Sequence, residues 1–167
     1  MRRPSPRADL PPRTSDNVKR QLAQGLAAED VYAQFGATTY GGSSKHKQNP
    51  HLFGLEPFRG IRGDRTLCDK HASFRPSDMA RIPALLDRAL RASLVGSHIW
   101  TVDDNGWIYE LAITNPATHE RHGYPLRPAE AIAEIVFRHF KVWAANGGSA
   151  SDKAAALACQ KLYGFKP

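Results

Sequence analysis

Histidine, lysine and arginine gather in two short stretches of this 167-residue chain. Residues 43–75 carry seven Lys/Arg and three His against three acids, and residues 119–124 add two His and a Tyr. Histidine titrates near neutral pH and can act as a general acid or base, while lysine and arginine stabilise the charge of a phosphate. These residue types in this proportion favour metal-independent chemistry on a phosphodiester.

Cleavage of RNA without a metal needs a base for the 2′-hydroxyl, an acid for the 5′-oxygen and cations beside the phosphorane. The predicted catalytic residues are His46, His51, His122 and Lys47. Further cations and an aromatic ring, which can stack on an unpaired base, give the predicted substrate-binding residues: Lys45, Arg59, Arg62, His119 and Tyr124. The sequence leaves open whether His46 or His51 pairs with His122.

The formal net charge of +7 is concentrated in the first half of the chain. Residues 1–75 hold thirteen Lys/Arg against seven Asp/Glu, whereas residues 76–167 hold ten against nine. A basic excess confined to one half favours a polyanionic partner, with RNA as the leading candidate. A solubilising basic surface would give the same numbers, so charge alone does not decide between them.

Several classes of protein and site are disfavoured by the sequence. It contains no apolar run long enough to span a membrane and no secretory h-region, so we expect a cytoplasmic protein without a membrane partner. No metal or cofactor is expected, because Walker, GxGxxG, HExxH and paired CxxC motifs are missing. Cys68 and His71 have the spacing of two zinc ligands, but the sequence offers no second pair of ligands to complete a zinc site. Cys68 is interpreted as a small buried residue, with a nucleophile served by His71 or His51 as the alternative.

We expect one α+β domain over residues 15–167, preceded by a disordered basic arm over residues 1–14, where Arg and Pro dominate. Within residues 15–40, a helix starting at Ser15 or Asp16 and ending near Gln24, and a second over residues 27–35, form a predicted helical hairpin. The sequence of this segment, QLAQGLAAEDVYAQFGATT, resembles the first two helices of a recombinase-type helix-turn-helix. The residues YGGSS follow where a recognition helix would stand, and they are poor helix formers.

The second half predicts a helix over residues 78–95, a hairpin over residues 98–114 turning at Asn105-Gly106, and a loop or short third strand over residues 116–125. Helices over residues 128–145 and 151–163 follow. Turns of two or four residues put Trp100, Val102, Trp107, Tyr109 and Leu111 on one face, and Ile99, Thr101, Ile108 and Glu110 on the other. The fold class is therefore α+β, with a small antiparallel sheet built on a central hairpin and packed by several helices.

Over residues 43–126, the run KHKQNPHLFG ends in Phe53-Gly54 and is followed by a helix and an antiparallel hairpin. This layout resembles the barnase–EndoU–colicin–RelE superfamily of small ribonuclease toxins, and most nearly the colicin D-type tRNA-cleaving domains. The resemblance implies cleavage of RNA, tRNA in particular, and an acidic neutralising partner protein. It also implies catalytic polar groups on the strands, but Thr101 and Tyr109 are predicted on opposite faces and could not share a site.

Other functions remain open at this point. The main alternative is a noncatalytic nucleic-acid-binding accessory or regulatory protein that uses the basic arm and the helical hairpin, with steep salt dependence. A protein-interaction module whose basic surface meets an acidic partner is a third hypothesis. An enzyme acting on a small phosphorylated ligand would need a phosphate cradle, which the sequence does not contain.

Overall fold

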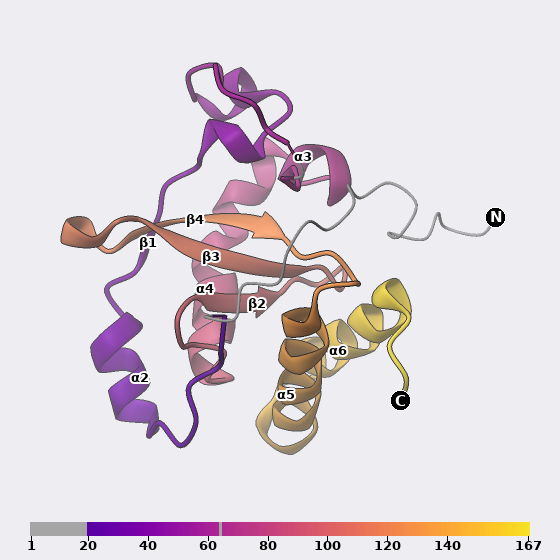
Figure 1. Ribbon diagram of the computed structural model, residues 1–167. Coiled ribbons are helices and arrows are strands. Elements are labelled where there is room, and N and C mark those ends of the chain that lie inside the picture. Colours follow the sequence, from indigo (N-terminus) through magenta and orange to yellow (C-terminus); the bar gives the residue numbers. More distant parts are fainter. Residues whose placement is uncertain (1–19, 64) are drawn as a thin grey trace.

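The computed structural model describes residues 20–63 and 65–167. The basic arm predicted for residues 1–14, and the beginning of the first predicted helix, lie outside these residues. The described chain folds into a four-stranded sheet in the order β1-β4-β3-β2, packed by helices (Figure 1). The predicted α+β class is thereby confirmed.

The sheet contains more than the predicted hairpin. Its strands are β1 (Thr39–Tyr40), β2 (Ile99–Val102), β3 (Ile108–Asn115) and β4 (Glu120–Pro125). Neighbours β2, β3 and β4 are antiparallel, while the short edge strand β1 runs parallel to β4. The helices are α2 (Ala28–Phe35), α3 (Cys68–His71), α4 (Ile82–Arg91), α5 (Ala131–Gly147) and α6 (Ala150–Tyr163).

The register of the hairpin differs from the prediction by one residue. Val102 pairs with Ile108, so the connection has five residues instead of two or four. The odd length is held by Asp103, whose carboxylate accepts hydrogen bonds from the backbone N–H groups of Asn105 and Trp107, both at 2.9 Å. Because a one-residue slip exchanges the faces of a strand, the predicted division of side chains is wrong.

The two faces of the sheet therefore have a different membership. The front face carries Trp100, Glu110, Ala112, His122 and Tyr124, and the back face carries Ile99, Thr101, Tyr109, Leu111 and Gly123. Thr101 and Tyr109 lie directly opposite each other on the back face, against the prediction that they are separated.

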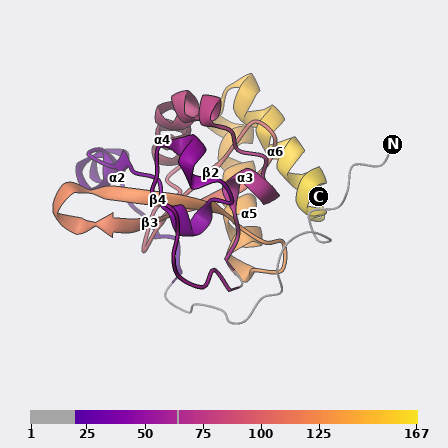
Figure 2. The same ribbon diagram turned by 90° about the horizontal axis from the view of Figure 1, so that it is seen from above.

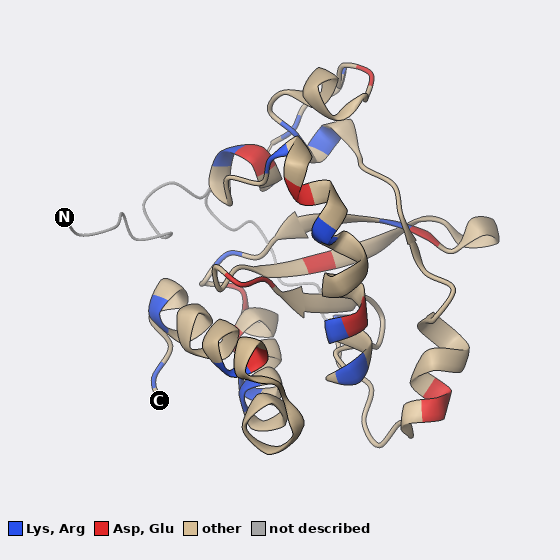
Figure 3. Cartoon of the chain, turned by 180° about the vertical axis from the view of Figure 1, so that it is seen from behind, with Lys and Arg blue, Asp and Glu red and all other residues tan. Residues whose placement is uncertain are grey.

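Helices cover the two faces unequally. Helix α4 covers the back face, where the Thr101 hydroxyl donates to the carbonyl of Leu85 at 2.7 Å. It lies behind the sheet in Figure 1 and in front of it in the reverse view of Figure 3. Helices α5 and α6 pack together at the end of the sheet remote from α2, as seen from above in Figure 2. Their apolar residues share one core cluster with Trp100, Val102 and Ile108 of the sheet.

The predicted helical hairpin does not form over the described residues. Residues 20–24 are extended instead of helical: Leu22 forms a bridge with Gly96, and the N–H of Ala23 donates to Val95 at 2.8 Å. A side chain at Gly96 would overlap the backbone carbonyl of Gln21, so glycine permits this close approach. Only the second predicted helix is confirmed, as α2.

The later helices follow the prediction with shifted ends. A 3₁₀ turn, Pro76–Arg81, precedes α4, which ends four residues before the predicted end at Val95. The last helix, α6, begins one residue before its predicted start at residue 151 and is capped by Ser149, whose hydroxyl accepts from the N–H of Asp152. Gly164 ends α6 in the left-handed conformation, as expected from its sequence position.

Gly106 in the hairpin loop is expected to be intolerant of substitution. Its φ is +92°, and an added Cβ would overlap the backbone of Ala158 and Cys159 in α6. Gly54 is a matched control, because its φ is +71° with no atom within 4 Å of the added Cβ. We expect Gly106→Ala to lower the free energy of unfolding in urea by about 1–3 kcal/mol more than Gly54→Ala. Equal losses would contradict this packing of α6.

Candidate functional site

An open groove of about 420 Å³ lies on the front face, over β3 and β4 and beside the part of the sheet that α5 and α6 cover. Its floor is formed by the front-face residues Glu110, Ala112, His122 and Tyr124. Its walls come from distant segments of the chain and include Arg20, Lys45, His46, Arg65, Thr66, His98, Arg127 and Glu130. The groove is rich in titratable groups, and the two basic stretches of the sequence meet in it.

Three aromatic rings stack in this groove. His122 and Tyr124 are two residues apart on β4, and the period of a strand puts both on the front face. The 3₁₀ turn Ser44–His46 brings the ring of His46 over them. The ring centroids lie 5.4 Å apart for His46 and His122 and 4.5 Å apart for His46 and Tyr124. The two histidines are thus close enough for a shared phosphodiester to contact both.

His46 is held in one orientation and one tautomer. Its Nδ1 lies 3.1 Å from the backbone oxygen of Thr66, and because a carbonyl oxygen can only accept, Nδ1 carries the proton. The other ring nitrogen, Nε2, is left with a lone pair that can take a proton. Burial is the main cause that lowers the pKa of His46 to about 3, so the imidazole is neutral at pH 7.

His122 is oriented by a threonine on the neighbouring strand. Its Nδ1 lies 2.7 Å from the hydroxyl of Thr114. Burial, together with the smaller effect of the positive charges of Lys45 and Lys47, lowers the pKa of His122 to about 4. Both histidines are only 6% exposed, and both are neutral at physiological pH.

Glu110 organises the floor of the groove. Its carboxylate accepts from the hydroxyl of Tyr124 at 2.5 Å, from Nε1 of Trp100 at 2.8 Å and from Nε of Arg20 at 2.8 Å. Arg20 also donates to Glu130 at 2.9 Å. Burial and the adjacent Glu110 raise the pKa of Tyr124, so its hydroxyl remains a donor committed to Glu110.

Two cations at the groove can face a bound anion. Lys45 is half-buried and Arg65 is exposed, and within the described part of the chain neither forms an ion pair with a carboxylate. Arg20, in contrast, is occupied by Glu110 and Glu130. A phosphate in the groove would therefore meet Lys45 and Arg65 beside the two histidines.

The structure brings together four of the nine predicted site residues: Lys45, His46, His122 and Tyr124. His51 is exposed in the turn Pro50–Phe53 and does not line the groove, so the geometry selects His46 as the neighbour of His122. His119 is exposed at the turn between β3 and β4, with φ of +55°.

The other predicted cations also lie outside the groove. Arg59 is exposed, and Arg62 donates to the backbone oxygen of Lys47 at 2.7 Å and lies over the ring of Phe58. Lys47 follows His46 directly in sequence, but its side chain lines a pocket on the back face. Lys47 therefore does not join His46 and His122.

The groove contains residues that were not predicted from the sequence, chiefly Glu110, Arg20, Arg65 and His98. Glu110 had a recognisable signal, since an acid in the middle of an apolar strand needs a buried partner. Arg20 had none, because it lies 90 residues from Glu110 in sequence. Charge gave little guidance: Figure 3 shows blue and red segments in many elements, and residues 43–75 carry both.

The two buried histidines are expected to make folding stability depend on pH. An unfolded histidine takes a proton near pH 6.5, whereas folded His46 and His122 take theirs at about 3 and about 4. The unfolded state therefore binds more protons below pH 6.5, and stability falls as the pH falls. From pH 7 to pH 5 we expect a loss of about 2 kcal/mol for each histidine in urea unfolding.

One acid opposes this trend. Burial raises the pKa of Asp103 to about 6, so the folded state takes up a proton there and gains about 1 kcal/mol over the same interval. The variants His46→Gln and His122→Gln keep Asp103, so its contribution cancels when the pH dependence of their unfolding free energy is compared with that of the parent. Each variant should show a smaller loss of stability than the parent, and an unchanged pH slope in both would contradict the assigned pKa shifts.

Comparisons with known proteins identify no relative: no protein-family model, no curated protein and no solved structure matches the chain. Within the part of the chain that the structure describes, no helix is both long and apolar enough to cross a bilayer.

Proposed function

We propose that this chain is a metal-independent endoribonuclease in which His46 and His122 transfer the protons. The observation that carries the proposal is the 5.4 Å separation of their ring centroids in an open groove that Lys45 and Arg65 also line. A ribonuclease of this kind needs two proton-transfer groups within reach of one phosphate, with cations beside it.

The tautomer of His46 suits it to be the base. Its Nε2 takes the proton of the 2′-hydroxyl, and the 2′-oxygen attacks the phosphorus. The bond from phosphorus to the 5′-oxygen breaks, and protonated His122 gives that oxygen its proton. The products are a 2′,3′-cyclic phosphate and a 5′-hydroxyl. Lys45 and Arg65 stabilise the negative charge of the phosphorane.

Substrate binding adjusts the protonation of the pair. Both histidines are neutral in the unliganded protein, whereas the acid must enter the reaction charged. The negative phosphodiester raises the pKa of a neighbouring imidazole and favours uptake of one proton by the pair. The Glu110 network acts as a support, because it fixes the Tyr124 ring on which His46 stacks.

The resemblance to colicin D-type domains supports tRNA as the substrate class, the cytoplasm as the place of action and an acidic protein as the neutralising partner. The same resemblance rests on the Lys/His run that includes Lys45 and His46, two residues of the groove. The partner would cover the groove cations with its own carboxylates.

The test is incubation of the purified protein with total RNA in EDTA, beside the double variant His46→Ala/His122→Ala. We expect the parent to cut RNA and the double variant to leave it intact. His51→Ala is the matched control, since His51 lies outside the groove, and it should retain parental activity. Intact RNA with the parent, or equal cutting by the double variant, would overturn the proposal. RNA that binds to the protein but is not cut would point to the noncatalytic nucleic-acid-binding alternative.

A further inference from the structure

A cluster of arginines lies on the irregular loop of residues 55–63 and 65, which adjoins the groove of the proposed ribonuclease site. Arg65 lines the groove, whereas Arg59 and Arg62, which were predicted to bind substrate, lie outside it. The loop belongs to the segment drawn above the sheet in Figure 1. The chemistry at the cleaved phosphate leaves Arg62 without a role.

The side chains of Arg62 and Arg65 converge on the ring of Phe58. Their guanidinium carbons lie 5.5 Å and 5.7 Å from the centroid of this ring. A turn of the backbone brings the two arginines together, because the N–H of Arg65 donates to the oxygen of Arg62 at 3.1 Å. Nη1 of Arg65 also donates to the oxygen of Ile61 at 3.0 Å. Two positive charges are thus held around one ring, one in the wall of the groove and the other outside it.

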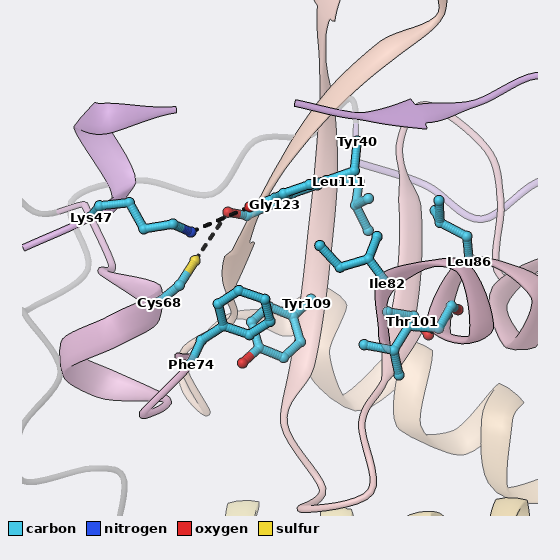
Figure 4. Close-up of a pocket in the computed structure, with 11 residues that line it drawn as sticks. Tyr40, Lys47, Cys68, Phe74, Ile82, Leu86, Thr101, Tyr109, Leu111 and Gly123 are labelled. Atoms are coloured by element: carbon cyan, nitrogen blue, oxygen red, sulfur yellow. Dashed lines mark hydrogen bonds between the residues drawn. The ribbon is translucent and has the colours of Figure 1, made fainter. Parts of the chain in front are cut away.

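Arg62 is tied to a buried part of the fold through Lys47. Its Nη2 donates to the backbone oxygen of Lys47 at 2.7 Å. Lys47 is only 1% exposed, and its side chain lines the back-face pocket together with Cys68 (Figure 4). Since Lys47 directly follows His46, this anchor also fixes Arg62 relative to the groove. A cation that is already held in place loses less side-chain entropy when it binds an anion.

The charges of Arg62 and Arg65 are not neutralised within the described part of the chain. No carboxylate there forms an ion pair with either arginine or with Glu56 as the acid of the loop, and Nε of Arg62 has no hydrogen-bond partner. Beside them, Ile61 is 89% exposed, more than any other large apolar side chain of the described residues. Guanidinium groups bind phosphates and stack on unpaired bases, so the cluster fits a strand of RNA.

We propose that Arg62, Ile61 and Arg65 form a subsite that binds the RNA strand next to the cleaved phosphate. The inference rests on the proposed ribonuclease function and deepens it, because it makes the substrate a strand that extends beyond one dinucleotide. Each phosphate along the strand carries a negative charge, so a strand that leaves the groove past Arg65 brings its next phosphate to Arg62. The exposed side chain of Ile61 adds apolar contact with the neighbouring base.

The test compares two substrates that each contain a single cleavable ribose: a dinucleotide, and a deoxyoctanucleotide with the same ribose and bases at its centre. We expect the parent to have a kcat/KM at least about tenfold higher for the octanucleotide, and Arg62→Met to lower the ratio of the two kcat/KM values about tenfold. Arg138→Met is the matched control. It removes an exposed arginine from α5, outside the loop and the groove, and should leave the ratio unchanged.

The ratio separates the subsite from other effects. A loosened loop that disturbs the groove lowers kcat/KM for both substrates alike, and residues 1–14 are the same in every variant. An unchanged ratio in Arg62→Met, or equal cleavage of the two substrates by the parent, would overturn the subsite and leave the ribonuclease proposal standing. No cleavage of either substrate by the parent would instead overturn the proposed function. If Arg62→Met does not fold, Ile61→Ser takes its place and should lower the ratio about threefold.

Discussion

Replacement of either His46 or His122 by alanine is expected to lower kcat/KM for RNA cleavage by about 10²–10⁴-fold. Each histidine moves one proton in the proposed reaction, and their rings lie 5.4 Å apart on one groove. The measurement is the initial rate of cleavage of a labelled RNA in EDTA. Because the two groups act as a unit, the double variant should lose little more activity than the more impaired single variant.

Two controls separate a chemical effect from a loss of structure. His51→Ala should retain parental kcat/KM, and the unfolding transition of each active-site variant should remain cooperative. Lys45→Met is expected to lower kcat/KM as well, by about tenfold, since it removes one cation from the phosphate. Full activity in folded His46→Ala or His122→Ala would contradict the assigned roles.

The pH dependence of kcat/KM is expected to be unusual for a pair of histidines. The reaction needs one proton on the pair, but the free protein carries none on either ring above about pH 5, because burial lowers their pKa values to about 3 and about 4. The reactive form therefore becomes tenfold rarer with each pH unit. Between pH 5.5 and pH 7.5 we expect kcat/KM to fall by about 100-fold.

The profile of kcat should be flatter than that of kcat/KM. The former reports the complex, in which the phosphodiester raises the pKa of the pair, and the latter reports the free protein. The assay stops at pH 5.5 because the free energy of unfolding falls further at lower pH, where the two buried histidines destabilise the fold most. A bell-shaped kcat/KM profile centred near pH 6.5 would show that the histidines are not desolvated in the free protein.

Local sequence signals predicted the elements well and their pairing poorly. Helices α5 and α6 appeared close to their predicted bounds, because apolar periodicity, a proline near the start and a glycine at the end are local properties. The strand β1 was missed, since two residues paired to a distant strand carry no pattern of their own. The segment at Leu22 was mistaken for a helix because its partner, Gly96, is far along the chain.

The hairpin shows how one local contact can reverse a prediction about function. The side chain of Asp103 holds a five-residue loop, and the odd length moves Glu110 to the face that carries Trp100. The carboxylate thus reaches the groove beside Tyr124, while Thr101 and Tyr109 come together on the other face. Turn propensity at Asn105-Gly106 gave the place of the turn, but not its length.

The candidate site was predicted in outline. Residues 43–75 and 119–124 were predicted to supply the catalytic histidines, and the rings of His46 and His122 from these two stretches do lie together. Sequence could not separate His46 from His51, or send Lys47 to the opposite face from its neighbour, because both outcomes depend on how one short turn meets the edge of β4. The support by Arg20 depends on chain segments 90 residues apart.

The most direct measurement of the central claim is the chemistry of the cleaved ends. A short RNA incubated with the protein in EDTA should give a 2′,3′-cyclic phosphate and a 5′-hydroxyl, because the proposed nucleophile is the 2′-oxygen activated by His46. The same oligonucleotide with 2′-deoxyribose at the cleaved position should remain intact. Cleavage of the deoxy substrate, or products that bear a 5′-phosphate, would contradict a histidine pair acting on the 2′-hydroxyl.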